Sequence, residues 1–104
     1  MNKYSLTILA CACALLAAST AQAAGDVAAG KAKAEDCADC HGDDGKGDDK
    51  NPAIAGMSTE KFTKALQEYQ NGVRTKSPKM TKEAKGLSAE DIANLAAYYA
   101  TLKK

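Results

Sequence analysis

Large aromatic side chains are scarce in this sequence. It contains no tryptophan, one phenylalanine and four tyrosines, so that aromatic residues make up 5% of the 104-residue chain. Few large side chains are therefore available to fill a hydrophobic core, and we expect a bound group to supply part of what is missing.

An excess of charge of either sign is also missing. The chain has 14 lysines and arginines against 13 aspartates and glutamates, for a formal net charge of +1. A nucleic-acid-binding domain needs a clear basic excess, so no nucleic-acid partner is expected. The sequence lacks internal repeats, low-complexity tracts and any convincing alternation of apolar and polar residues that would predict strands. These absences favour a small all-α domain.

A hydrophobic run long enough to span a bilayer is not present either. The apolar segment at residues 6–18 is 13 residues long, whereas a membrane-spanning helix needs about 20. Lys3 precedes this segment, and Ala21-Gln22-Ala23 follows it as an A-x-A cleavage site. This order predicts a signal peptide over residues 1–23, removed on export, and a mature domain over residues 24–104 without a membrane span.

Two other interpretations of the N-terminal segment stay open. It could be an uncleaved anchor, or a lipoprotein signal that uses Cys11 or Cys13, although both cysteines lie in the middle of the apolar run. Cleavage after residue 23 leaves 81 residues with only Cys37 and Cys40. A domain this small often needs a disulfide, a metal or a cofactor to supplement its core.

Three segments of the mature chain have helical character. We expect helices at residues 26–40, 59–71 and 88–102, because capping residues begin each one and apolar residues recur at helical spacing in the second and third. The segments between them, at residues 42–56 and 73–87, are rich in glycine, proline, aspartate and lysine and are expected to be loops. Loops of this length are unusual in so small a domain unless they wrap around something.

The sequence CADCHG at residues 37–42 holds both remaining cysteines and the single histidine. A zinc site requires four ligands, and a thioredoxin-like dithiol accompanies a βαβ pattern; the chain offers neither. A disulfide between the two cysteines would close a loop too short to add much stability. Residues 39–49 lack the ligand spacing of a calcium loop. C-x-x-C-H, in contrast, is the sequence to which haem c is attached.

The spacing within this motif has a physical reason. Cys37 and Cys40 can each form a thioether with one vinyl group of the same porphyrin, because two intervening residues let the backbone span the distance between these groups. His41 then follows directly beneath the iron, where a neutral imidazole nitrogen can coordinate. The sequence therefore predicts one covalently bound haem c with His41 as an iron ligand.

The second axial ligand of the iron must be a different kind of residue, because His41 is the only histidine. The mature chain has two methionines, Met57 and Met80. A methionine commonly fills gaps in a core, and this role suits Met57, which follows the apolar residues Ile54 and Ala55. Met80 stands among polar neighbours, so we favour it as the distal ligand. Met57 and an open or water-bound site remain the alternatives.

Four stretches give the sequence a resemblance to a known family. They are GKAKAEDCADCHG, NPAIAG, YQNGVRTKSPKM and LSAEDIANLAAYYATL, and together they span most of the mature chain. The sequence resembles the small class I bacterial cytochromes c. The resemblance implies an all-α class I fold, in which the N-terminal and C-terminal helices cross and the loops wrap around one haem.

The same resemblance implies roles for individual residues. It makes His41 the proximal ligand and Met80 the distal ligand, and it lets the Pro52 carbonyl accept a hydrogen bond from His41. It also matches Gly30 to the glycine at the helix crossing, with Tyr98 or Tyr99 as the aromatic partner.

One departure from the family pattern precedes the motif. The family usually carries a bulky apolar or aromatic pair there, and this chain has Lys33 and Ala34. This departure predicts a looser helix crossing.

The resemblance also implies a function. We expect a periplasmic one-electron carrier rather than an enzyme, a monomer that meets transient redox-protein donors and acceptors. Two alternatives remain: a haem-binding subunit of a larger oxidoreductase, and a haem enzyme or gas sensor with a labile sixth ligand.

Overall fold

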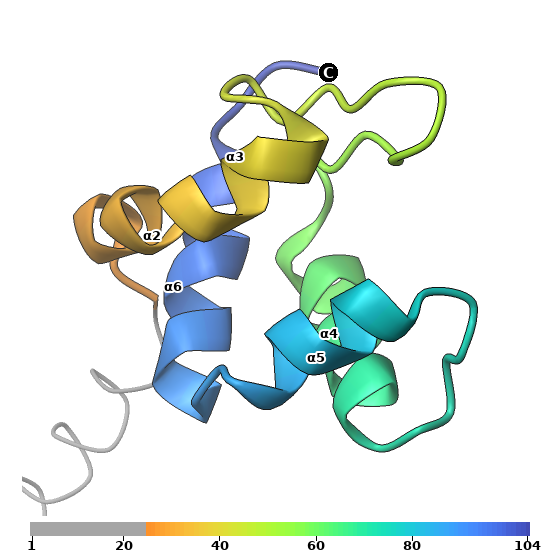
Figure 1. The fold of residues 1–104 in the computed structure, drawn as a ribbon. Helices are drawn as coiled ribbons and strands as arrows, with labels where there is room; N and C mark the ends of the chain where they lie inside the picture. Colours follow the sequence, from red (N-terminus) through yellow and green to blue (C-terminus); the bar gives the residue numbers. More distant parts are fainter. Residues whose placement is uncertain (1–24) are drawn as a thin grey trace, which may run out of the picture.

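Five helices make up the regular structure of the computed structural model, which describes residues 25–104 (Figure 1). They are α2 (Val27–Lys33), α3 (Glu35–His41), α4 (Thr59–Gln70), α5 (Pro78–Lys85) and α6 (Ala89–Ala100). The described part of the chain contains no strand, which confirms the predicted all-α class. None of these helices has the length and apolar character needed to cross a membrane. The expected signal peptide at residues 1–23 lies outside the described residues.

The predicted helix at residues 26–40 is in fact two helices. Asp26 caps α2, because its side chain accepts hydrogen bonds from the N–H groups of Ala28 and Ala29. A turn at Ala34 ends α2 and begins α3, which then extends to His41. Gly42 ends α3 with a φ of 84°, a conformation that glycine adopts at little cost. Ala34 itself keeps helical angles, with φ −66° and ψ −12°, so α3 and the cysteine motif follow α2 after only a short interruption.

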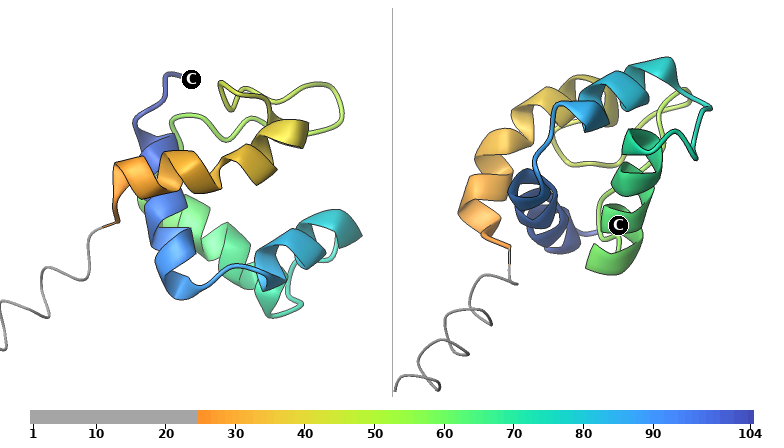
Figure 2. Two further views of the ribbon diagram at one scale, coloured as in Figure 1. Left: turned by 60° about the vertical axis from the view of Figure 1, so that its left-hand side comes forward. Right: turned by 90° about the horizontal axis from the view of Figure 1, so that it is seen from below.

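Helix α2 crosses α6 in close contact (Figure 2). A Cβ atom at Gly30 would overlap the Asn94 carbonyl and come within 2.8 Å of the Tyr98 Cβ. Tyr98 is therefore the aromatic residue that faces Gly30. At this crossing Ala34 is buried and the Lys33 ammonium lies 3.9 Å from the Asp91 carboxylate of α6, so both residues of the departing pair have contacts, and the looser crossing stays a prediction.

The core lies between α6 and α4. Helix α6 buries Ile92, Leu95, Ala96 and Tyr99 on one stripe, and α4 buries Phe62 and Leu66 against them. The Tyr99 ring stacks on the Phe62 ring, with 5.5 Å between their centroids. The expected apolar faces of the second and third helices are thus the faces that the structure buries.

The segment at residues 73–87, expected to be a loop, contains α5, so that expectation is wrong for residues 78–85. The Ser77 hydroxyl accepts a hydrogen bond from the Met80 N–H at 3.2 Å, and Pro78 occupies the first turn, where its missing N–H costs nothing. Lysine, glutamate and alanine fill the remaining positions and favour a helix. The helix was missed because it has no apolar stripe of ordinary width.

Candidate functional site

A cavity of about 620 Å³ opens between α3, the loop at residues 42–56, α4 and α5. Figure 1 shows α3 and this loop on one side and α4 with α5 on the other. The volume falls within the range of about 300–1,000 Å³ that is typical of ligand sites. Its apolar wall includes these side chains: Ile54, Phe62, Ala65, Leu66, Tyr69 and Leu87. The cavity is therefore suited to a large, mostly apolar group.

The cysteine motif forms one wall of the cavity. Cys37 and Cys40 lie three residues apart on α3 and so share a helix face, and both line the cavity together with His41. The imidazole of His41 is only 5% exposed. Its Nδ1 lies 2.8 Å from the Pro52 carbonyl oxygen. A carbonyl oxygen can only accept, so Nδ1 carries the proton and the lone pair of Nε2 is left free for a metal.

The loop that carries Pro52 is held by its own polar contacts. The Gly47 N–H donates to the His41 carbonyl at 2.8 Å, and the Asp48 side chain accepts from the N–H groups of Lys50 and Asn51, each at 2.8 Å. These two backbone donors hold the pKa of the Asp48 carboxyl below its usual range. Gly47 has a φ of 69°, and a Cβ there would overlap the Asn51 carbonyl. The loop thus requires a glycine at this position to present Pro52 to His41.

The two thiols have different surroundings. Burial raises the pKa of the Cys37 thiol. The Cys40 sulfur lies 3.0 Å from the Lys79 ammonium of α5, and this contact raises the pKa of Lys79. The contact joins residues 39 apart in the sequence. It places the start of α5, directly before Met80, beside the cysteine motif.

Both candidate methionines line the cavity. Met80 is the third residue of α5, is half-buried and contacts the core. Met57 precedes α4, is also half-buried and contacts the same core. The structure therefore brings Cys37, Cys40, His41, Pro52 and Met80 to one cavity, but it places Met57 there too. The choice of Met80 as iron ligand stays a prediction.

The family model for cytochrome c matches residues 27–103. This chain belongs to the cytochrome c family. The match covers α2 to α6 and both sides of the cavity, so the predicted family is confirmed. In this cytochrome c, the C-x-x-C-H sequence with Cys37 and Cys40 binds one haem c covalently.

Named relatives agree with this family. Cytochrome c4 of Pseudomonas aeruginosa is 39% identical over 104 residues, which cover 99% of this chain and 50% of that protein. Cytochrome c-554(548) of Halomonas halodenitrificans is 42% identical over 81 residues, 75% of this chain and 98% of that protein. The cytochrome subunit of sulfide dehydrogenase from Chlorobaculum tepidum is 43% identical over 68 residues, 65% of this chain and 61% of that protein.

A solved structure confirms the fold. Cytochrome c4 of Acidithiobacillus ferrooxidans matches with a TM-score of 0.71 and 27% identity, covering 76% of this chain and 51% of that protein. The chain is thus a class I cytochrome c, as predicted. It spans about half the length of the cytochromes c4 that it matches.

The cavity of this cytochrome c fits the haem c that the family carries. Both cysteines and His41 belong to the same wall, and aromatic and aliphatic side chains form much of the rest. The sequence pattern did not single out Leu66 and Tyr69 as wall residues. The helical spacing of Phe62, Ala65, Leu66 and Tyr69 was the available signal, but it indicates only a buried face and not what that face contacts.

Proposed function

We propose that this cytochrome c is a periplasmic one-electron carrier whose haem iron is bound by His41 and Met80. The observation that supports it best is that a histidine with a fixed tautomer and a half-buried methionine line one apolar cavity from separate helices. If His41 and Met80 both bound the iron, no coordination site would be left for a substrate or for oxygen. Bound haem supplies a reversible ferric/ferrous couple, and a methionine ligand raises its potential.

The chain's own residues keep this couple suited to electron transfer. The Pro52 carbonyl accepts a hydrogen bond from the Nδ1–H of His41 and so fixes the orientation and tautomer of the ring. Phe62 and Leu66 give the cavity an apolar wall, and a haem packed against this wall would displace water from it. A change in the oxidation state of the haem iron would then require little rearrangement of protein or solvent.

Export is part of the same proposal. Residues 1–23 have the order of a cleavable signal peptide, which leaves residues 24–104 as the cytochrome c domain. Haem c is attached outside the cytoplasm, so a signal peptide and a C-x-x-C-H motif belong together.

The experiment that tests this function uses the full chain, expressed in a bacterial host that attaches haem c and recovered from the periplasmic fraction. We expect an intact mass of residues 24–104 plus one haem. We also expect a redox titration that follows a reversible one-electron Nernst curve, and a reduced protein that does not bind carbon monoxide. Ready binding of carbon monoxide by the reduced protein would instead indicate an open sixth site, as in a haem enzyme or gas sensor.

Charged side chains near the cavity suggest how partners meet this protein. Five basic side chains line the cavity, and three of them come from the segment of residues 73–87: Arg74, Lys79 and Lys82. Lys76 and Lys85 belong to the same segment, which also contains Glu83, whereas seven of the acidic side chains lie near the cysteine motif: Glu35, Asp36, Asp39, Asp43, Asp44, Asp48 and Asp49. Transient redox partners are steered by this separation of charge, with anionic ones directed to the α5 side.

Charge reversal on α5 tests this steering. The variant with Lys79→Glu and Lys82→Glu should be oxidised by ferricyanide about fivefold more slowly than wild type at low ionic strength, because an anion is no longer attracted to the cavity. The difference should shrink as salt is added. The control reverses Lys31 and Lys64, which are exposed and do not line the cavity, and has the same net charge. Equal rates for the two variants would mean that only net charge matters.

A second function has specific support in the relative from Chlorobaculum tepidum, which is named as a cytochrome subunit of sulfide dehydrogenase. By this alternative the chain is the haem-binding subunit of a larger oxidoreductase rather than a free monomer. Gel filtration of periplasmic extract from the source cells distinguishes the two functions. A free carrier elutes near the mass of one chain, whereas a subunit elutes at the larger mass of its complex.

A further inference from the structure

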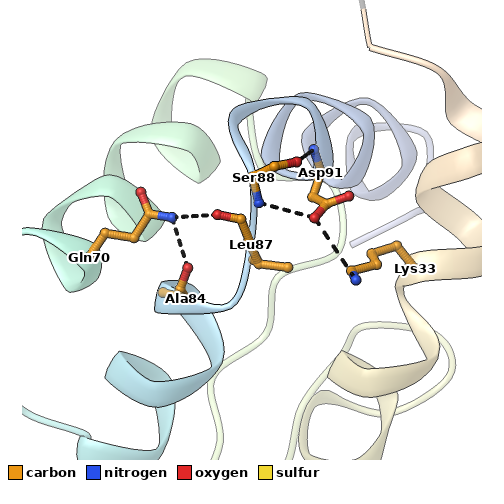
Figure 3. A network of polar contacts seen from close by, with 6 residues as sticks. All are labelled: Lys33, Gln70, Ala84, Leu87, Ser88 and Asp91. Atoms are coloured by element: carbon orange, nitrogen blue, oxygen red, sulfur yellow. Dashed lines mark hydrogen bonds and ion pairs between the residues drawn. The ribbon is translucent and has the colours of Figure 1, made fainter.

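The last residue of α4 sends its side chain to the far end of α5. The Gln70 Nε2 donates one hydrogen bond to the Ala84 carbonyl at 2.8 Å and a second to the Leu87 carbonyl at 3.0 Å (Figure 3). These contacts bridge 14 and 17 residues and are partly buried. The two N–H groups of one side-chain amide thus each donate a hydrogen bond to a backbone carbonyl at the C-terminal end of α5.

Helix α5 depends on contacts of this kind. It has eight residues, which is too short for a helix to be stable by itself. Its start is capped by Ser77, and its end is held by Gln70. Ala84 is fully buried and lies one turn after Met80, on the same face, and both residues line the cavity. Gln70 therefore fixes the turn of α5 that follows Met80.

The same contacts continue toward the cysteine motif. Directly after Leu87, Ser88 and Asp91 form a capping box, with 3.0 Å between donor and acceptor in each of its two hydrogen bonds. The Asp91 carboxylate lies 3.9 Å from Lys33, which is four residues before Cys37 (Figure 3). Polar contacts thus join α4, α5, α6 and α2, and they connect the segment of Met80 to the segment of the proximal ligand.

We propose that Gln70 is a positioning residue that keeps Met80 on the haem iron. The inference rests on the proposed function, since it takes Met80 to be the distal ligand. An incoming ligand can replace Met80 only if the α5 segment moves, and this movement separates Gln70 from the Ala84 and Leu87 carbonyls. The two hydrogen bonds therefore favour the methionine-bound state over the displaced state.

The test is Gln70→Glu in the holoprotein. Glutamate has the same size and a similar helix propensity, but its ionised carboxylate offers no proton to the two carbonyls. The probe is imidazole, which competes with Met80 for ferric iron, and its binding is followed by loss of the weak far-red absorption band of methionine-bound ferric haem. We expect the apparent dissociation constant for imidazole to fall about tenfold, equivalent to about 1.4 kcal/mol and in keeping with the net contribution of such hydrogen bonds.

Two further variants complete the design. Gln67→Glu makes the same charge change one turn earlier in α4, at an exposed position, and should leave imidazole binding unchanged. Gln70→Lys restores N–H donors to the two carbonyls and should return the dissociation constant toward that of wild type.

The outcomes separate this inference from the function on which it rests. If Gln70→Glu lowers the thermal unfolding temperature but leaves both the far-red band and imidazole affinity unchanged, Gln70 is only structural and the inference is wrong. If the wild-type protein lacks the band, the assignment of Met80 as ligand fails, and this inference fails with it. If the wild-type protein shows the band and imidazole binds more tightly only to Gln70→Glu, the result supports both the role of Gln70 and methionine ligation of the iron.

Discussion

Replacing Met80 by alanine should abolish the far-red band of the oxidised protein and let the reduced protein bind carbon monoxide. The change removes the thioether that we propose as distal ligand and leaves the haem attached, because Cys37, Cys40 and His41 are untouched. Methionine ligation favours ferrous iron, so the reduction potential should also fall, on the order of 0.2 V within the roughly 0.8 V range that axial ligands span. Absorption spectra with and without carbon monoxide, and a redox titration, measure these changes.

The matched control is Met57→Ala. Met57 lines the same cavity and is half-buried like Met80, so the two variants remove the same side chain from similar surroundings. The control should keep the band, the potential and the closed sixth site, and should lose only packing against the core. The reverse result, with the band lost in Met57→Ala alone, would assign the ligand to Met57 and contradict the proposed role of α5.

The features that the sequence predicted best are those that depend on residues close together in the chain. A capping residue at position 88 predicted the start of α6, and the structure shows a capping box there, with both hydrogen bonds between Ser88 and Asp91 present. The apolar stripes of α4 and α6 follow the helical period and are buried as expected. The C-x-x-C-H motif predicted the cofactor because its spacing is set by the porphyrin and not by the rest of the fold.

The features that the sequence did not predict depend on contacts between distant segments. Helix α5 has few apolar residues, and its position is set by partners such as Gln70, 14 residues before Ala84. The break at Ala34 has no proline or glycine to indicate it. The sequence favoured Met80 over Met57 because of its polar neighbours, and this choice stays a prediction because both methionines line the cavity.

Loss of the haem should have the largest effect on stability. The variant with Cys37→Ser and Cys40→Ser cannot form thioethers, and we expect it to lose most of its helical circular dichroism at 25 °C. The reason lies in the core. Among residues 25–104, four of the nine buried hydrophobic residues are alanines, so the side chains themselves bury little apolar area.

The size of the cavity indicates how much the haem contributes. Without haem, the apolar walls of a cavity of about 620 Å³ lose the group that they would pack against and are exposed to water. A domain of this size has a total stability of about 5–15 kcal/mol, so the chain without haem should not hold its native packing.

The single variant Cys37→Ser is the control: it keeps Cys40 and His41, should retain haem through one thioether, and should stay largely helical. A double variant with wild-type circular dichroism and a cooperative unfolding transition would contradict the argument, because the helices would then be stable without the group around which they are arranged.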